Sequence, residues 1–139
     1  PFMIGSKNNI SVNQHDIREI QLAKSAIYSG IKILMKVTDS SFNDIEALYL
    51  AGGFGNYINI DSALEIGLLP NEMKGRIYPV GNSAGIGALQ YLKSDEFDKR
   101  LYKLLANSEY IELSDYDEFI TEFAMNMNFV KDLSGKIFD

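Results

Sequence analysis

Apolar residues recur at steps of three and four along the first part of the chain, the spacing that lines one face of an α-helix. The positions that share this face are Ile17, Ile20, Lys24, Ile27, Ile31, Leu34 and Met35. The spacing predicts a long helix over residues 14–37. Asn13 is its expected N-cap, and Asp16 completes a carboxylate form of the capping box. Gly30 interrupts this helix at a cost of about 1 kcal/mol relative to alanine, so we expect a packing reason for it.

Two shorter apolar runs follow, and each of them leads into glycine. Residues 45–50 and 77–80 are nearly continuous apolar segments, which are typical of strands covered on both faces in a parallel or mixed sheet. After the first run, Asn59 or Asp61 is the expected cap of a short helix that Gly67 ends.

The second half of the chain is predicted to be mostly helical. The downstream elements are expected to be a helix of small residues capped by Asn82 or Ser83, a helix over residues 97–105, a strand over 110–113, and a helix capped by Ser114. This order of helices and strands predicts one α/β domain over residues 1–139, with a small mixed sheet flanked by helices.

Composition narrows the chemistry that the chain can support. The 139 residues include no cysteine, which excludes disulfides, cysteine-ligated zinc, an iron–sulfur cluster and a thiol nucleophile within this segment. The one histidine, His15, is expected to be solvent-exposed in the first helical turn. A single histidine argues against a histidine-based metal site and a Ser–His–Asp triad. We therefore assign no catalytic residue and no metal ligand.

Charge and hydropathy narrow the list of partners. The net charge is −6, and residues 107–139 carry the excess of acidic side chains. This acidic region is interpreted as a solvated face or, alternatively, as a surface for a basic partner domain. The lack of a basic face argues against nucleic-acid binding, and no apolar run has the length of a membrane span. The first residues resemble neither a signal peptide nor a natural start, which suggests a piece of a longer polypeptide.

Two glycine-rich turns, at residues 52–56 and 81–84, are the strongest candidates for a binding site. Ligands of open α/β sheets collect beyond the carboxyl ends of the strands, and helix N-termini there bind anions. Gly52 and Gly53 would let a phosphate, ribose or base contact the main chain, which a Cβ would obstruct. Neither turn has a Walker A or Gly-x-Gly-x-x-Gly pattern. The residues alone leave two interpretations open, nucleotide or phosphate binding and tight turns that serve only packing. Lys24 on the long helix either extends to the rim or reaches into a cleft.

Four motifs in one order link the chain to a known family. They are Asp16-Ile17-Arg18-Glu19-Ile20-Gln21-Leu22-Ala23-Lys24-x-Ala26-Ile27, Leu50-Ala51-Gly52-Gly53-Phe54-Gly55-Asn56-Tyr57-Ile58, Ile66-Gly67-Leu68-Leu69-Pro70 and Val80-Gly81-Asn82-x-Ala84-Gly85-x-Gly87-Ala88. Over about residues 10–129 the sequence resembles the C-terminal part of the reductive activators of corrinoid proteins. These relatives have an N-terminal plant-type [2Fe–2S] ferredoxin domain and a C-terminal ATPase domain of the acetate kinase, sugar kinase, heat-shock chaperone and actin (ASKHA) superfamily. The resemblance implies a lobe of a ribonuclease H-like fold.

The resemblance also implies a set of nucleotide-binding residues. Residues 50–56 are similar to the adenosine motif of the superfamily, and the preceding helix lines the adenine pocket there. The residues expected around the nucleotide are Gly52, Gly53, Phe54, Gly55, Asn56, Gly81, Asn82, Ser83, Ala84, Gln21, Lys24 and Ser25. The phosphate-gripping loops, the metal-coordinating carboxylate and any catalytic base are expected upstream of this segment.

The implied reaction is an ATP-dependent reduction of cobalt(II) corrinoid to cobalt(I), with Mg²⁺ accompanying ATP and a [2Fe–2S] cluster in an N-terminal domain that this chain lacks. The implied partner is a corrinoid protein, the expected location is the cytoplasm, and a homodimer stays open. The segment alone is expected to be inactive and to bind nucleotide weakly. Two alternatives remain: a non-catalytic interaction or dimerisation module of the same fold, and a fragment of a small-molecule kinase.

Overall fold

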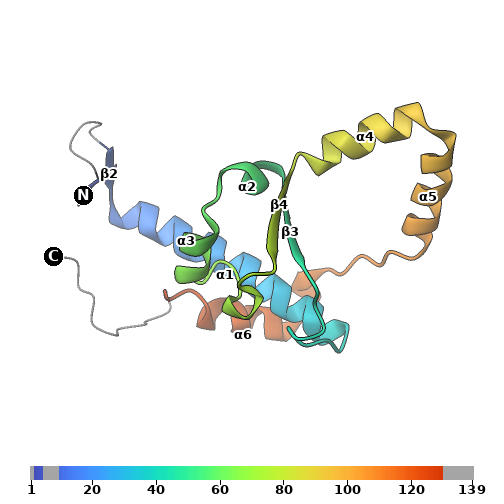
Figure 1. Ribbon diagram of the computed structural model, residues 1–139. Coiled ribbons are helices and arrows are strands. Elements are labelled where there is room, and N and C mark those ends of the chain that lie inside the picture. The colour runs from blue at the N-terminus through green and yellow to red at the C-terminus, as the bar shows by residue number, and fades with distance from the viewer. Residues whose placement is uncertain (1, 5–9, 130–139) are drawn as a thin grey trace.

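The computed structural model describes residues 2–4 and 10–129. In chain order the elements are β1 (Phe2–Ile4), β2 (Ile10–Val12), α1 (Gln14–Val37), β3 (Leu48–Ala51), α2 (Gly52–Tyr57), α3 (Ile60–Glu65), β4 (Ile77–Gly81), α4 (Ser83–Lys93), α5 (Asp95–Ala106) and α6 (Asp117–Met125), with 3-10 turns at Asn71–Met73 and Leu113–Asp115 (Figure 1). The α/β class, with small sheets flanked by helices, is confirmed. Among the described residues, no helix combines the length and the apolar character needed to cross a membrane.

Asparagine side chains begin three of the helices, as predicted. The Asn13 side chain accepts hydrogen bonds from the first turn of α1, and the Asp16 carboxylate accepts one from the Asn13 N–H at 2.9 Å, which completes the capping box. Asn59 and Asn82 each accept a hydrogen bond from the N–H three residues on, at 2.8 and 3.0 Å. These caps satisfy N–H groups that lack a partner within the helix.

The long helix α1 is buried along a face slightly different from the predicted one. Ile33, which the predicted face omitted, is its most fully buried apolar residue, whereas Ile20 and Leu34 are exposed. The expected packing reason for Gly30 is confirmed, because a Cβ at this position would lie 3.3 Å from the Leu113 side chain. The glycine therefore lets the chain before α6 pack closely on α1.

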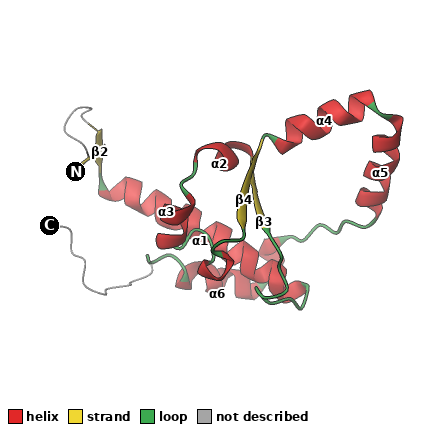
Figure 2. Ribbon diagram, in the orientation of Figure 1, coloured by secondary structure: helices red, strands yellow, loops and turns green. Residues whose placement is uncertain are grey.

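The two strands expected in the middle of the chain form a parallel pair, β3 with β4. Figure 2 shows them at the centre of the described region, with α1 and α6 on one side and α4 leading away. Tyr49 pairs with Tyr78, and the register shifts between Leu50 and Ala51. The predicted mixed sheet is therefore two separate pairs, since β1 and β2 form their own antiparallel hairpin.

The predicted strand over residues 110–113 is wrong. This segment has no strand partner among the described residues, and Tyr110 is 83% exposed. The predicted cap of the last helix is also wrong: the Ser114 hydroxyl donates to Glu112, and α6 starts after Tyr116 without a side-chain cap. A β-prone run becomes a strand only where a neighbouring strand or surface packs on it.

The core lies where α3 and the following turn pack beneath the β3–β4 pair. Its buried members are Ala63, Leu64, Leu68, Leu69, Met73 and Ile77, with Ile27 of α1 and Leu48 and Leu50 of β3 packed against them. The Arg76 guanidinium donates to the Ile45 and Glu72 carbonyls and so ties the chain before β3 to the chain before β4. This arrangement helps to fix where both strands begin.

Candidate functional site

The structure brings the two glycine-rich segments together at the carboxyl ends of β3 and β4. Ala51 pairs with Gly81 across the sheet. A Cβ built on Gly55 would collide with the Leu50 carbonyl oxygen and lie 3.0 Å from the Gly81 nitrogen, and a Cβ built on Gly81 would lie 3.1 Å from the Asn56 side chain. Close packing on the backbone of both strands therefore explains Gly55, whereas Gly81 is explained by its positive φ together with this packing.

Gly52 and Gly53 differ from those two residues. No atom lies within 4 Å of the position of a Cβ on either of them. The backbone at residue 52 has a φ of +68°, a conformation that favours glycine. Residue 53 has no positive φ, so its backbone conformation does not require glycine. Its main chain stays bare next to open space, the arrangement that a closely approaching ligand needs.

The segment after Ala51 is a short helix, α2, where a glycine turn was expected. Its Gly53, Phe54 and Tyr57, together with Ile58, line an open cavity of about 520 Å³. Phe54 and Tyr57 are both exposed, so aromatic and aliphatic surface adjoins the bare main chain. Such a surface suits the face of a planar, partly apolar ligand.

Sequence reasoning did not single out Tyr57 and Ile58 as site residues. They follow Phe54 by three and four positions, so that in a helix all three share one face. Predicting α2 as a helix would have supplied this signal.

The second segment contributes mainly its backbone. Gly81 has a φ of +60°, and the Asn82 side chain is engaged in capping α4. Ser83 and Ala84 are exposed in the first turn of this eleven-residue helix. Of the N–H groups in that turn, the one of Gly85 is satisfied by the Asn82 side chain.

The predicted residues of α1 lie elsewhere. Lys24 is only 2% exposed, and its Nζ donates to the Asn126 carbonyl at 2.7 Å, while the Ser25 hydroxyl donates to the Phe123 carbonyl. Both side chains thus reach inward to the C-terminal end of α6. Burial lowers the pKa of Lys24.

Gln21 lines a third region, a cavity of about 780 Å³ that it shares with His15 and Arg18. None of Gln21, Lys24 and Ser25 lines the cavity beside Gly53. Their contact with a nucleotide therefore stays a prediction, and it would need another arrangement of the helix or a ligand that extends between these regions.

The described residues can line a binding site, but they supply no evident reacting group. They include no cluster of three histidine or acidic side chains suited to a metal ion. His15 is exposed, as predicted, and its Nε2 lies 3.9 Å from Glu19 on the next turn of α1. The absence of cysteine means that an iron–sulfur cluster of the usual ligation does not fit this chain. The arrangement can bind and orient a ligand but holds no evident acid, base or nucleophile.

Comparisons with known proteins agree with each other. A family model described as the C-terminal domain of RACo, the ASKHA domain, matches residues 3–136. Over 121 residues the chain is 37% identical to a protein named corrinoid activation enzyme RamQ, from Eubacterium limosum, and this match covers 87% of the chain and 20% of that protein. A solved structure of a reductive activator for corrinoid, iron-sulfur protein superposes with a TM-score of 0.78 at 32% identity, covering 85% of the chain and 19% of that structure. The chain thus spans about a fifth of the length of the relatives it matches.

Proposed function

Because this chain belongs to the family of the C-terminal ASKHA domain of RACo, we propose that it forms one wall of the nucleotide cleft in an ATP-dependent activator of corrinoid proteins. In this proposal the chain is the C-terminal part of a longer polypeptide, hereafter the complete polypeptide. Its substrate is a corrinoid whose cobalt(II) is returned to cobalt(I), and ATP supplies the free energy for this uphill reduction.

The observation that carries the proposal is the open main chain at Gly53. Packing explains Gly55, and backbone conformation explains Gly52 and Gly81, but neither explains Gly53. A residue without a side chain, next to an aromatic cavity and beside the start of α4, fits an adenosine moiety lying against the backbone.

The proposal divides the work between this chain and the rest of the complete polypeptide. The residues described above would hold the adenosine part of ATP, with Gly53, Phe54 and Tyr57 closest to it. The phosphate-binding loops, the Mg²⁺ ligands and the [2Fe–2S] cluster would belong to the upstream part, because the described residues form no carboxylate cluster and the sequence has no cysteine. The corrinoid protein is the proposed partner and the cytoplasm the proposed location.

The test is nucleotide binding by the complete polypeptide carrying Gly53→Val. The valine side chain enters open space, so folding is expected to persist, while the ligand loses its approach to the backbone. We expect calorimetry with ATP or ADP and Mg²⁺ to show affinity reduced about tenfold or more, which corresponds to about 1.4 kcal/mol. Ser62→Val, on the exposed surface of α3, is the matched control and should bind as the unsubstituted protein does.

Two results would argue against the proposal. Unchanged affinity in Gly53→Val would separate the open glycine from the nucleotide. A complete polypeptide that neither binds nor hydrolyses ATP would favour a non-catalytic interaction module of the same fold. A small-molecule kinase is distinguished by the upstream coding sequence, where a reductive activator requires four clustered cysteines for its cluster.

A further inference from the structure

Helix α4 is apolar on every side, yet none of its residues is buried by the described part of the chain. Lys93, at its end, carries its only formal charge, whereas Ile86, Leu89 and Leu92 are all exposed, Leu92 to 81%. Figure 1 shows α4 and α5 extending away from the body formed by α1, α3 and α6. A helix that is hydrophobic all round is characteristic of a protein interior and not of a surface.

Helix α5 shows the contrasting pattern of a surface helix. Its main apolar residues are Phe97, Leu101, Leu104 and Leu105, at steps of three and four, and most of the remaining positions are charged. Arg100 pairs with Glu96 at 2.8 Å on this charged side. One face of α5 is therefore suited to solvent, and the other face is suited to an apolar neighbour.

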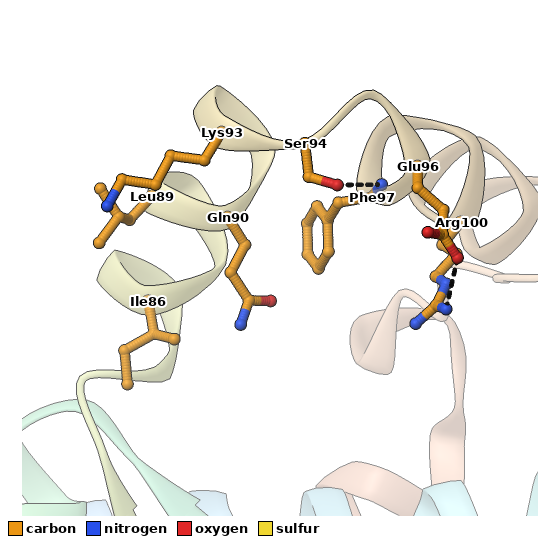
Figure 3. A pocket seen from close by; sticks show the side chains of 8 residues that line it. All are labelled: Ile86, Leu89, Gln90, Lys93, Ser94, Glu96, Phe97 and Arg100. Carbon is orange, nitrogen blue, oxygen red and sulfur yellow. Dashed lines mark hydrogen bonds and ion pairs between the residues drawn. The ribbon is translucent and has the colours of Figure 1, made fainter.

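Between the two helices lies a cavity of about 430 Å³. Figure 3 shows the Phe97 ring of α5 and the Gln90 side chain of α4 projecting into the space between the helices, whereas Leu89 and Lys93 project to the other side of α4. Polar and charged side chains, among them Glu96 and Arg100, line the cavity together with Ile86 and Phe97, but most of the lining surface is apolar. A mainly apolar lining with a few polar groups suits an apolar segment of polypeptide better than it suits a small polar ligand.

The adjoining β3–β4 sheet also has exposed apolar surface. Strands β3 and β4 form a parallel pair without further strands among the described residues. The rings of Tyr49 and Tyr78, with centroids 5.9 Å apart, are both exposed on this pair. Parallel sheets normally have both faces covered, so the uncovered surface extends from the sheet into α4.

We infer that α4 is an interior helix of the complete polypeptide, enclosed by the part of the ASKHA domain that precedes this chain, with an apolar segment of that part seated between α4 and α5. About four-fifths of the relatives' length lies outside the chain, so this occupant has ample length. A second copy or a reversible partner fits less well. Whenever such a partner dissociates, the α4 surface is exposed to water. A helix that is apolar on every side would then present a large exposed apolar patch.

Cysteine accessibility tests this inference, since the chain has no cysteine of its own. Leu92→Cys on α4 and the control Lys103→Cys on the charged side of α5 are placed singly in the complete polypeptide. Both positions are exposed in the described structure. Alkylation by N-ethylmaleimide is followed by mass spectrometry of the two peptides, at low protein concentration and without nucleotide. We expect Leu92→Cys to react at least about tenfold more slowly than Lys103→Cys, because reaction then requires local opening.

Each other outcome overturns the inference. Equal rates would mean that nothing in the same polypeptide covers α4. Protection that appears only as the protein concentration rises would identify a second copy, and protection only after addition of a corrinoid protein would identify that partner. Hydrogen exchange of the α4 amides in the unsubstituted polypeptide repeats the test if Leu92→Cys does not accumulate. Because no nucleotide is used, this result does not depend on whether the polypeptide binds ATP. In the same way, the nucleotide-binding test does not depend on whether α4 is enclosed.

Discussion

At the scale of single residues, neighbouring glycines have different physical causes. A Cβ on Gly55 would press on the Gly81 backbone, Gly52 needs a left-handed φ, and Gly53 faces open space. From the sequence, packing and ligand binding were alternatives for the whole turn. The structure shows packing at Gly55 and an open main chain at Gly53, a distinction that depends on how β3 and β4 align and is therefore invisible in the sequence.

Gly55→Ala and Gly53→Ala form a matched pair that separates these causes. The added methyl at residue 55 would collide with the Leu50 carbonyl oxygen and lie 3.0 Å from the Gly81 nitrogen, so that the backbone would have to shift. We expect Gly55→Ala to lower the free energy of unfolding by about 1–3 kcal/mol, the usual cost of overpacking. Gly53→Ala should leave it unchanged or raise it by up to about 1 kcal/mol, because alanine favours the helix. Urea denaturation of both variants measures the difference, and equal destabilisation would contradict the assignment.

At the scale of elements, local signals were enough for most of the helices but not for every strand. The spacing of apolar residues and the caps Asn13, Asn59 and Asn82 predicted α1, α3 and α4 because these interactions join residues close in sequence. The predicted strand at 110–113 failed because pairing needs a distant partner. Helix α2 was missed because glycine is a poor helix former, and here the contact with β4 overrides that propensity.

The contact between α1 and α6 is another long-range feature that no local pattern indicated. The two helices run antiparallel and are joined by ion pairs from Lys32 to Glu122 at 3.0 Å and from Lys36 to Glu118 at 2.6 Å. The hydrogen bond from Lys32 lowers the pKa of Glu122, and the hydrogen bond from Lys36 lowers the pKa of Glu118. Both carboxylates are therefore easier to ionise in the folded chain than in the unfolded chain.

This difference predicts acid sensitivity of the α6 attachment. A carboxylate whose folded pKa is lowered contributes stability that is complete above its ordinary value of 4.5 and is lost as the pH falls through the folded value. We expect the free energy of unfolding to decline below about pH 4.5, by a modest amount because both pairs are partly exposed. Unfolding by urea between pH 3 and 6 measures the slope, which Glu122→Gln should make shallower.

A comparison with a remote carboxylate gives the control for that experiment. Glu96→Gln removes an exposed ion pair within α5 that joins no distant elements. Its slope with pH should stay close to that of the unsubstituted chain. A slope in Glu122→Gln equal to that in Glu96→Gln would show that the α1–α6 pairs do not couple to folding.

At the scale of the whole molecule, the chain has one apolar region that is buried within it and another apolar region that stays exposed. The residues around Leu64 and Met73 are buried by their own neighbours, whereas no α4 residue is buried among the described residues. The sequence predicted a helix in both regions. The spacing of apolar residues indicates which residues need to be buried, but it does not indicate which part of the protein buries them. Identifying that part requires the complete polypeptide.

This contrast predicts that one substitution has different effects on stability in two lengths of the same protein. In the 139-residue chain, Leu92→Glu replaces an exposed leucine on a helix by a good helix former, so the free energy of unfolding should change by no more than about 0.5 kcal/mol. Its solubility should rise as apolar surface is lost. In the complete polypeptide the same glutamate would be buried without a partner, and stability should fall by about 2–4 kcal/mol. Denaturation and solubility measurements on both lengths test this, and the same effect in both would show that α4 meets the same surroundings in each.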